Sequence, residues 1–221
     1  MQINIFVEGF DDQELVAALL VKMGEVGQRQ EAGKNWQAIT EAGNKVAIYE
    51  MGGWTTLPTN KLRPLLQQGP EVEVQNLVIY DADTISHEHG GFTARRAELL
   101  RQKAELSLHF ELFLFPTNEA DGNLEDLLEY LIHPNHQQVT GCFASYEICM
   151  RNCVGPTGLP YRLPANKAKF YAYVEAMPLS DEERKAHKSR GATKYFSNSD
   201  YWNLDADEIS PLTDFLDRNI Q

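Results

Sequence analysis

Residues 77–84 read LVIYDADT, and residues 5–12 read IFVEGFDD. Each stretch is an apolar run that ends in clustered carboxylates. Apolar runs of this length are typical of strands that are buried on both faces of a parallel sheet. Packing gives no reason for Glu8, Asp81 and Asp83 at the strand ends, where like charges repel one another. The two stretches therefore predict two buried strands, and a site for something cationic where those strands end.

Strands and helices alternate through the first part of the chain. Further strands are predicted at residues 36–39, 45–54 and 109–116, and helices at residues 11–24, 59–69, 92–106 and 122–132. This alternation predicts an α/β fold with a mostly parallel sheet flanked by helices. We expect residues 1–133 to form that core. Residues 134–221 are expected to form a C-terminal helical extension packed on the core as one compact unit, with helices near 143–153, 167–177 and 210–220.

The helix predicted at residues 92–106 carries small and apolar residues at helical spacing. Ala97, Leu100 and Ala104 lie on one side of the predicted helix, and its arginines and lysine lie on another side.

The composition limits the classes of partner and compartment. The 221 residues carry a net charge of −12, which repels a phosphate backbone, so any nucleic-acid contact has to be local or metal-mediated. Three cysteines without CxxC spacing argue against a disulfide scaffold and a zinc knuckle, and favour a reducing cytoplasm. The sequence shows no signal-peptide pattern and no apolar run of about 18 residues, so neither export nor a membrane span is expected.

The acids at the strand ends are expected to meet in one place. In an open α/β sheet, ligands bind beyond the carboxyl ends of the parallel strands, which is where the sequence puts Glu8, Asp81 and Asp83. Hard oxygen ligands in this arrangement suit Mg²⁺ or Mn²⁺. For Asp11 and Asp12, a second interpretation is that one of them is the N-cap of the following helix.

The same residues resemble a known fold. Residues 5–16, IFVEGFDDQELV, resemble the first strand and helix of the toprim domain, and residues 78–84, VIYDADT, resemble its DxD strand. Residues 113–128, FLFPTNEADGNLEDLL, and residues 166–174, NKAKFYAYV, resemble later elements of a bacterial toprim-like domain of unknown function. That domain is related to the nuclease domains of overcoming-lysogenization-defect proteins. The resemblance spans most of residues 3–216.

This resemblance implies a toprim-like, Rossmann-like fold and a nuclease that uses Mg²⁺ or Mn²⁺. It implies that Glu8 is the general acid/base or a metal ligand, and that Lys167 stabilises negative charge on phosphate. It also implies nucleic acid as the substrate and a separate ATPase or other protein as a partner, because related nucleases are often fused to or partnered with an ATPase. The acids that it places around the metal are Glu8, Asp12, Asp81, Asp83, Glu125 and Asp126.

Two other functions stay open. VIYDADT also fits the DxDxT signature of haloacid-dehalogenase phosphatases, in which Asp81 would be the nucleophile and Asp83 the acid/base. The fold is also compatible with binding a metal, a nucleotide or a partner protein without turnover, because fold does not dictate activity.

Some of these residues also have purely structural interpretations. Glu125 and Asp126 suit the first turn of a helix, where acids are favourable. Lys167 is by default a solvated lysine. Phe196 and Trp202, in an aromatic-rich segment, either stack on nucleic-acid bases or fasten the C-terminal segment to the core.

Overall fold

The computed structural model describes residues 1–24, 26–29, 36–40, 42–189 and 195–220. The chain divides into two compact units. The first, the α/β unit, contains Met1–Tyr130 and Leu204–Gln221, and the second, the helical unit, contains Leu131–Asn203. The predicted boundary at residue 133 is close to the change of unit at residue 131, whereas residues 204–221, predicted within the extension, cluster with the α/β unit.

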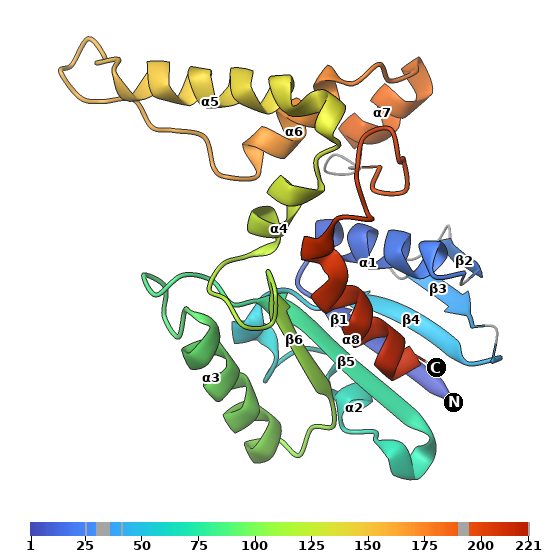
Figure 1. The fold of residues 1–221 in the computed structure, drawn as a ribbon. Coiled ribbons are helices and arrows are strands. Elements are labelled where there is room, and N and C mark those ends of the chain that lie inside the picture. Colours follow the sequence, from blue (N-terminus) through green and yellow to red (C-terminus); the bar gives the residue numbers. More distant parts are fainter. Residues whose placement is uncertain (25, 30–35, 41, 190–194, 221) are drawn as a thin grey trace. The chain divides into compact units, whose positions relative to one another are not determined.

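The elements of the α/β unit follow the predicted alternation (Figure 1). The strands are β1 (Gln2–Val7), β2 (Val26–Arg29), β3 (Trp36–Ile39), β4 (Lys45–Glu50), β5 (Val74–Asp81) and β6 (Glu111–Phe115). The helices are α1 (Phe10–Lys22), α2 (Arg63–Leu66), α3 (Phe92–Glu105), α4 (Leu124–Leu131), which runs into the helical unit, and α8 (Ser210–Ile220). Short 3₁₀ turns are η1 (Trp54–Thr56), η2 (Pro70–Val72) and η4 (Asp207–Ile209).

The six strands form one mixed sheet in the order β2-β3-β4-β1-β5-β6. β1 is parallel to both β4 and β5, and β5 is parallel to β6, whereas β3 is antiparallel to β2 and β4. The expected α/β class with a mostly parallel sheet is confirmed. Since Val7 of β1 pairs with Ile79 of β5, the carboxyl ends of these two neighbouring strands meet at the same edge of the sheet.

Both faces of the central strands are buried, as their apolar sequences predict. On one face, Val78 and Leu114 of the sheet pack in a core cluster with Leu66 of α2 and Leu99 of α3. The opposite face is covered by α1 and α8 (Figure 1), and there Phe113 of β6 contacts Phe215 with ring centroids 5.4 Å apart. Burial on both faces explains why the second halves of these strands, Ile5–Val7 in β1 and Leu77–Tyr80 in β5, lack charged and amide side chains.

The buried face of α3 is not the side that carries Ala97, Leu100 and Ala104. Ala97 and Ala104 are exposed and Leu100 is only half-buried. The helix instead buries Arg95, Glu98, Leu99 and Gln102. Arg95 is buried on this face because it pairs with Asp83, two residues after the end of β5.

The helical unit is held together by aromatic residues. Its helices are α5 (Gln137–Arg151), α6 (Ala168–Ala176) and α7 (Asp181–Ser189), with the 3₁₀ turn η3 (Pro134–His136) before α5. Trp202 is buried and contacts Tyr173 and Phe196 with ring centroids 5.2 and 4.9 Å apart. Phe196 is 2% exposed, so its role is packing and not base stacking. None of the described helices is both long and apolar enough to cross a membrane.

A single glycine weakens α5. A Cβ added at Gly141 would meet no atom within 4 Å. Gly141→Ala is therefore expected to raise the free energy of unfolding of the helical unit by about 0.5–1 kcal/mol, because alanine loses less backbone entropy in a helix. Gly158→Ala is the matched control: its surroundings are equally open, but its φ of +78° makes alanine strained, so a loss of about 1 kcal/mol is expected. Thermal unfolding followed by circular dichroism measures both, and equal signs would contradict the argument.

Candidate functional site

Glu8 and Asp81 meet at the carboxyl ends of β1 and β5. Glu8 is the first residue after β1, and Asp81 is the last residue of β5. The backbone N–H of Asp81 donates to Oε1 of Glu8 at 3.2 Å. The parallel pairing of the two strands thus brings together two acids that are 73 residues apart in the sequence.

Asp12 joins them from the first turn of α1. The N-cap of this helix is Gly9, so neither Asp11 nor Asp12 occupies the cap position proposed for them. Asp12 instead lies three residues further on, and its Oδ2 accepts a hydrogen bond from the Gly9 N–H at 2.7 Å. The N-cap prediction is therefore wrong for both acids, but one oxygen of Asp12 still satisfies a backbone N–H at the helix N-terminus, and its other oxygen is left for the site.

Asp81 also fixes the start of α4. Its Oδ1 accepts a hydrogen bond from the N–H of Leu124, the first residue of that helix, at 2.9 Å. The next residue, Glu125, lies close enough for its charge to raise the pKa of both Asp12 and Asp81. Asp126 has a capping role: its Oδ2 accepts from the Asn123 N–H at 2.8 Å, and its own N–H donates to Asn123 Oδ1. α4 therefore brings Glu125 toward the acids and uses Asp126 at its own N-terminus.

Glu8, Asp12 and Asp81 share one hydrogen-bonding pattern. In each of them, one carboxylate oxygen accepts a hydrogen bond from a backbone N–H, and the other oxygen accepts no hydrogen bond from the described residues. Burial raises the pKa of Asp12 and Asp81 well above the ordinary 3.8, and the neighbouring carboxylates raise it further. Burial also raises the pKa of Glu8, and the charge of Asp83 adds to that shift. We call Glu8, Asp12 and Asp81 the acid triad.

Asp83 is bound to a buried arginine that the sequence did not point to. Nη2 of Arg95, on α3, donates to Asp83 Oδ2 at 2.6 Å, and the Arg95 side chain is 0% exposed. Its guanidinium lies 4.5 Å from the ring centroid of Trp54. Nε and Nη1 of Arg95 have no hydrogen-bond partner among the described residues. Burial lowers the pKa of Arg95, and the charges of Asp83, Glu8 and Asp81 oppose that shift. Arg95 is thus a fixed cation beside the acids.

Two further residues are candidates for a chemical role. Tyr80 is a core residue of β5, and its hydroxyl has no hydrogen-bond partner among the described residues. Burial raises its pKa, with added effects from Glu8 and Asp12, so the phenol stays protonated and is a poor nucleophile. Lys167 is an exposed residue of the helical unit and directly precedes α6. Its role at phosphate stays a prediction.

The acid triad has the donor chemistry for a hard divalent cation, without a preformed coordination sphere. Its unused carboxylate oxygens are the ligands that Mg²⁺ and Mn²⁺ prefer. Gly53 leaves space beside Glu8, since a Cβ there would lie 3.3 Å from Oε2. Within the described parts of the chain, no three His, Cys, Asp or Glu side chains form a group arranged to hold a metal. The residues therefore fit the cation, but the carboxylates would have to draw closer to bind it.

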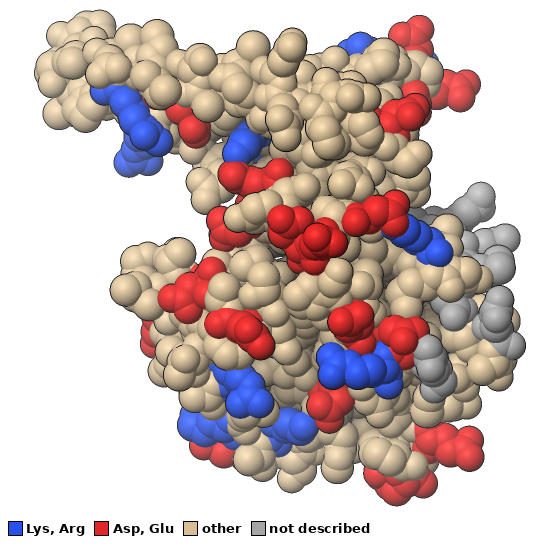
Figure 2. All heavy atoms as spheres, viewed as in Figure 1, with Lys and Arg blue, Asp and Glu red and all other residues tan. Residues whose placement is uncertain are grey.

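The surface charge is consistent with the sequence. Acidic side chains predominate on the face shown in Figure 2, as the net charge of −12 requires. Such a surface attracts divalent cations and repels polyanions. The charge of this surface therefore favours a cationic ligand over a polyanionic one.

Comparison with known proteins places the chain without giving it a function. The model of a family described as protein of unknown function (DUF3226) matches residues 2–221. None of the curated proteins matches the sequence.

Proposed function

The chain belongs to the DUF3226 family, and we propose that it hydrolyses phosphodiester bonds of nucleic acid with the help of a bound Mg²⁺ or Mn²⁺ ion. One observation carries the proposal: the acid triad brings one buried and two half-buried carboxyl groups next to one another, each with an oxygen that accepts no hydrogen bond from the described residues. Burying like charges is costly unless a cation offsets them. The resemblance of residues 5–16 and 78–84 to toprim nucleases supports the same function.

The residues of the triad would have different roles. Asp12 and Asp81 would hold the cation, with Asp83 and Glu125 near it, because their positions are fixed by α1, β5 and α4. When bound, the cation polarises a phosphoryl oxygen and lowers the pKa of a bound water. Burial raises the pKa of Glu8 above that of an exposed glutamate, which makes its carboxyl group better suited to exchange a proton as a general acid or base.

Arg95 would act as a positioning residue. Its bond to Asp83 holds a backbone with a φ of +59° at Asp83, a conformation that is unfavourable for most residues other than glycine, Asn and Asp. The two N–H groups of Asp83 and Gly122 also bond to each other's carbonyl oxygens, at 2.6 and 2.9 Å. The loop that follows β5 is therefore fixed in place next to the triad.

Cleavage assays test the proposed function. The purified protein is incubated with single-stranded DNA, double-stranded DNA, RNA and a phosphomonoester, in Mn²⁺ or in EDTA. We expect Mn²⁺-dependent cleavage of at least one nucleic acid, reduced about 100-fold or more in Glu8→Gln, which is the low end of the effect of a general acid or base. Asp214→Asn, an exposed acid on α8, is the matched control and is expected to cleave like the parent.

The same assay separates the alternatives. Turnover of the monoester that survives Glu8→Gln and is lost in Asp81→Asn would favour a phosphatase with Asp81 as the nucleophile. Tight Mn²⁺ binding measured by calorimetry, together with inertness toward every substrate, would favour a binding protein without turnover. If the protein neither binds Mn²⁺ nor cleaves, the proposed function is wrong.

A further inference from the structure

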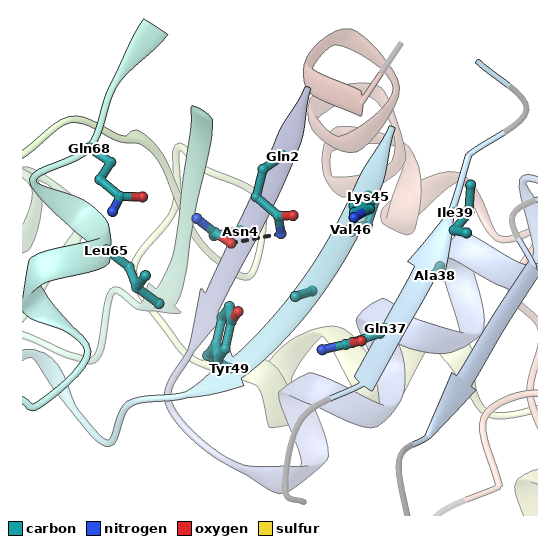
Figure 3. A pocket seen from close by; sticks show the side chains of 11 residues that line it. Gln2, Asn4, Gln37, Ala38, Ile39, Lys45, Val46, Tyr49, Leu65 and Gln68 are labelled. Atoms are coloured by element: carbon teal, nitrogen blue, oxygen red, sulfur yellow. Dashed lines mark hydrogen bonds between the residues drawn. The ribbon is translucent and has the colours of Figure 1, made fainter. Parts of the chain in front are cut away.

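A cavity of about 800 Å³ lies on the α/β unit, and none of its described lining residues belongs to the acid triad. It opens on the sheet face that carries Asn4 of β1 and Tyr49 of β4 (Figure 3). Gln2 and Lys45, which are paired across these strands, line its other end. Since Gln2 is six residues before Glu8 on an extended strand, this end of the cavity is about 20 Å from the triad. We call it the amide pocket.

Three side-chain amides, those of Asn76, Asn4 and Gln2, are joined by hydrogen bonds from the core to the amide pocket. The side-chain N–H groups of Asn76, on β5, donate to the carbonyl oxygens of Leu65, Gln68 and His109 at 3.2, 2.8 and 2.9 Å. Asn76 Oδ1 then accepts from Asn4 Nδ2 at 2.9 Å. Asn76 and Asn4 are each 2% exposed.

The orientation of each amide in this chain is determined. If Asn76 were turned over, its oxygen would face three carbonyl oxygens, so only one orientation is stable. Asn4 must therefore direct its N–H toward Asn76, and its Oδ1 accepts from Gln2 Nε2 at 3.1 Å. Asn4 Nδ2 has two hydrogens and one acceptor among the described residues, so one buried donor is left over.

The row of hydrogen-bonded amides ends at Gln2, whose side chain presents a donor and an acceptor side by side. Gln2 uses one hydrogen of Nε2 on Asn4, which leaves its second hydrogen and its Oε1 for a ligand. An amide edge of this kind pairs in bidentate fashion with a nucleobase, and best with the N6 and N7 atoms of adenine.

Charge and shape in the amide pocket also suit a nucleotide. The described residues of its lining include Lys45 and no Asp or Glu. The amide pocket therefore differs from the chain as a whole, which carries a net charge of −12. The Tyr49 ring is stacked on Phe6 with centroids 5.4 Å apart, so it is held as a rigid aromatic surface. The volume of the pocket is within the range of about 300–1,000 Å³ that is common for small-molecule sites.

From these observations we infer that the amide pocket is a nucleobase-binding site that prefers adenine. Gln2 would read the edge of the base, Tyr49 would stack on its ring, and Lys45 would pair with the phosphate of a nucleotide. The inference does not rest on the proposed hydrolysis, because none of these residues belongs to the acid triad.

Calorimetric titrations in EDTA test the site while the acid triad is kept free of metal. The ligands are AMP, adenosine, guanosine, cytidine, uridine and a single-stranded oligoadenylate. We expect saturable binding of AMP and adenosine that is tighter than binding of the other nucleosides. Tyr49→Leu is expected to weaken the binding of both AMP and adenosine at least about tenfold, within the range measured for base–aromatic stacking. Lys45→Met is expected to weaken AMP about two- to fivefold and to leave adenosine unchanged.

Two more variants make the result decisive. Lys61→Met, an exposed lysine outside the lining, is the matched control and should bind AMP like the parent. Ala47→Leu fills the floor of the amide pocket, where Ala47 is 2% exposed, and should abolish binding while the protein stays folded by circular dichroism. Equal binding of oligoadenylate and AMP would indicate a free nucleotide as the ligand, and tighter binding of the oligomer a base within a strand.

Three results would overturn the inference. One is the absence of heat and of amide chemical-shift changes with every nucleoside. Another is binding that Tyr49→Leu and Ala47→Leu both leave unchanged. The third is a dimer in solution that Ala47→Leu dissociates, since the amide pocket would then be covered by a second copy of the chain.

Discussion

Asp83→Asn is expected to lower the free energy of unfolding by about 3 kcal/mol, because it leaves the guanidinium of Arg95 buried without the carboxylate that it contacts. Losses of about 3–5 kcal/mol are typical when one partner of a buried ion pair is removed. The low end applies here because Glu8 and Asp81 also lie close enough to favour the charge of Arg95. Asparagine tolerates the positive φ of this position, so the variant reports on charge and not on backbone strain.

Arg95→Met is the matched variant and should be the less harmful of the two. Methionine keeps an unbranched apolar chain in the space beside Trp54, and the remaining carboxylate of Asp83 is 29% exposed and so partly hydrated. A loss of about 1–2 kcal/mol is expected, and the double variant should be more stable than Asp83→Asn alone. Urea unfolding in EDTA at pH 7 measures all three. If Asp83→Asn costs no more than Arg95→Met, Arg95 does not depend on this ion pair.

The strands and the position of the acids could be predicted because both are local patterns. An apolar run of strand length identifies β1 and β5, and the rule that parallel strands end together places Glu8 next to Asp81. Arg95 could not be found in this way, because helical periodicity assigns charged residues to the solvent face. Its burial depends on carboxylates that come from other elements of the fold, which no local pattern of α3 contains.

Two elements were not predicted, for different reasons. β2 reads VGQR, which is too short and too polar to show the alternation of a strand. α7 is charged throughout, so it has no apolar stripe. The signal that identifies α7 is the capping box formed by Ser180 and Glu183: the Ser180 N–H donates to Glu183 Oε2, and the Glu183 N–H donates to Ser180 Oγ. Helix-start chemistry therefore locates helices that periodicity misses.

The stability of the metal-free protein is expected to fall as the pH rises from about 5 to 8. The pKa values of Glu8, Asp12 and Asp81 are raised in the folded state. Above the ordinary carboxyl pKa, the folded state thus binds more protons than the unfolded state, and stability decreases with pH through this window. Glu98 has the opposite shift, to a pKa of about 2, so above about pH 6 it is ionised in both states and adds no slope.

Asp12→Asn isolates this effect from the titration of the histidines. The amide oxygen of asparagine can still accept the hydrogen bond from Gly9, while the buried charge is removed. The variant is expected to be more stable than the parent at pH 8 by about 1 kcal/mol, with a flatter dependence on pH. Thermal unfolding in EDTA from pH 5 to 8 measures both quantities. If stability changes with pH in the same way in the parent and the variant, the charge of Asp12 does not destabilise the folded state.

Mn²⁺ should reverse the loss of stability in the parent and not in the variant. A cation that binds only the folded state stabilises it by about 2.7 kcal/mol at 100 times its dissociation constant. The gain should be largest at pH 8, where the carboxylates are ionised and repel one another most. Asp12→Asn and Asp81→Asn should each lose most of this gain, whereas Asp214→Asn should keep it. Such a result would show that the acid triad lowers the stability of the metal-free protein and binds the cation. An equal gain in stability with Mn²⁺ in all four proteins would show that the cation binds elsewhere.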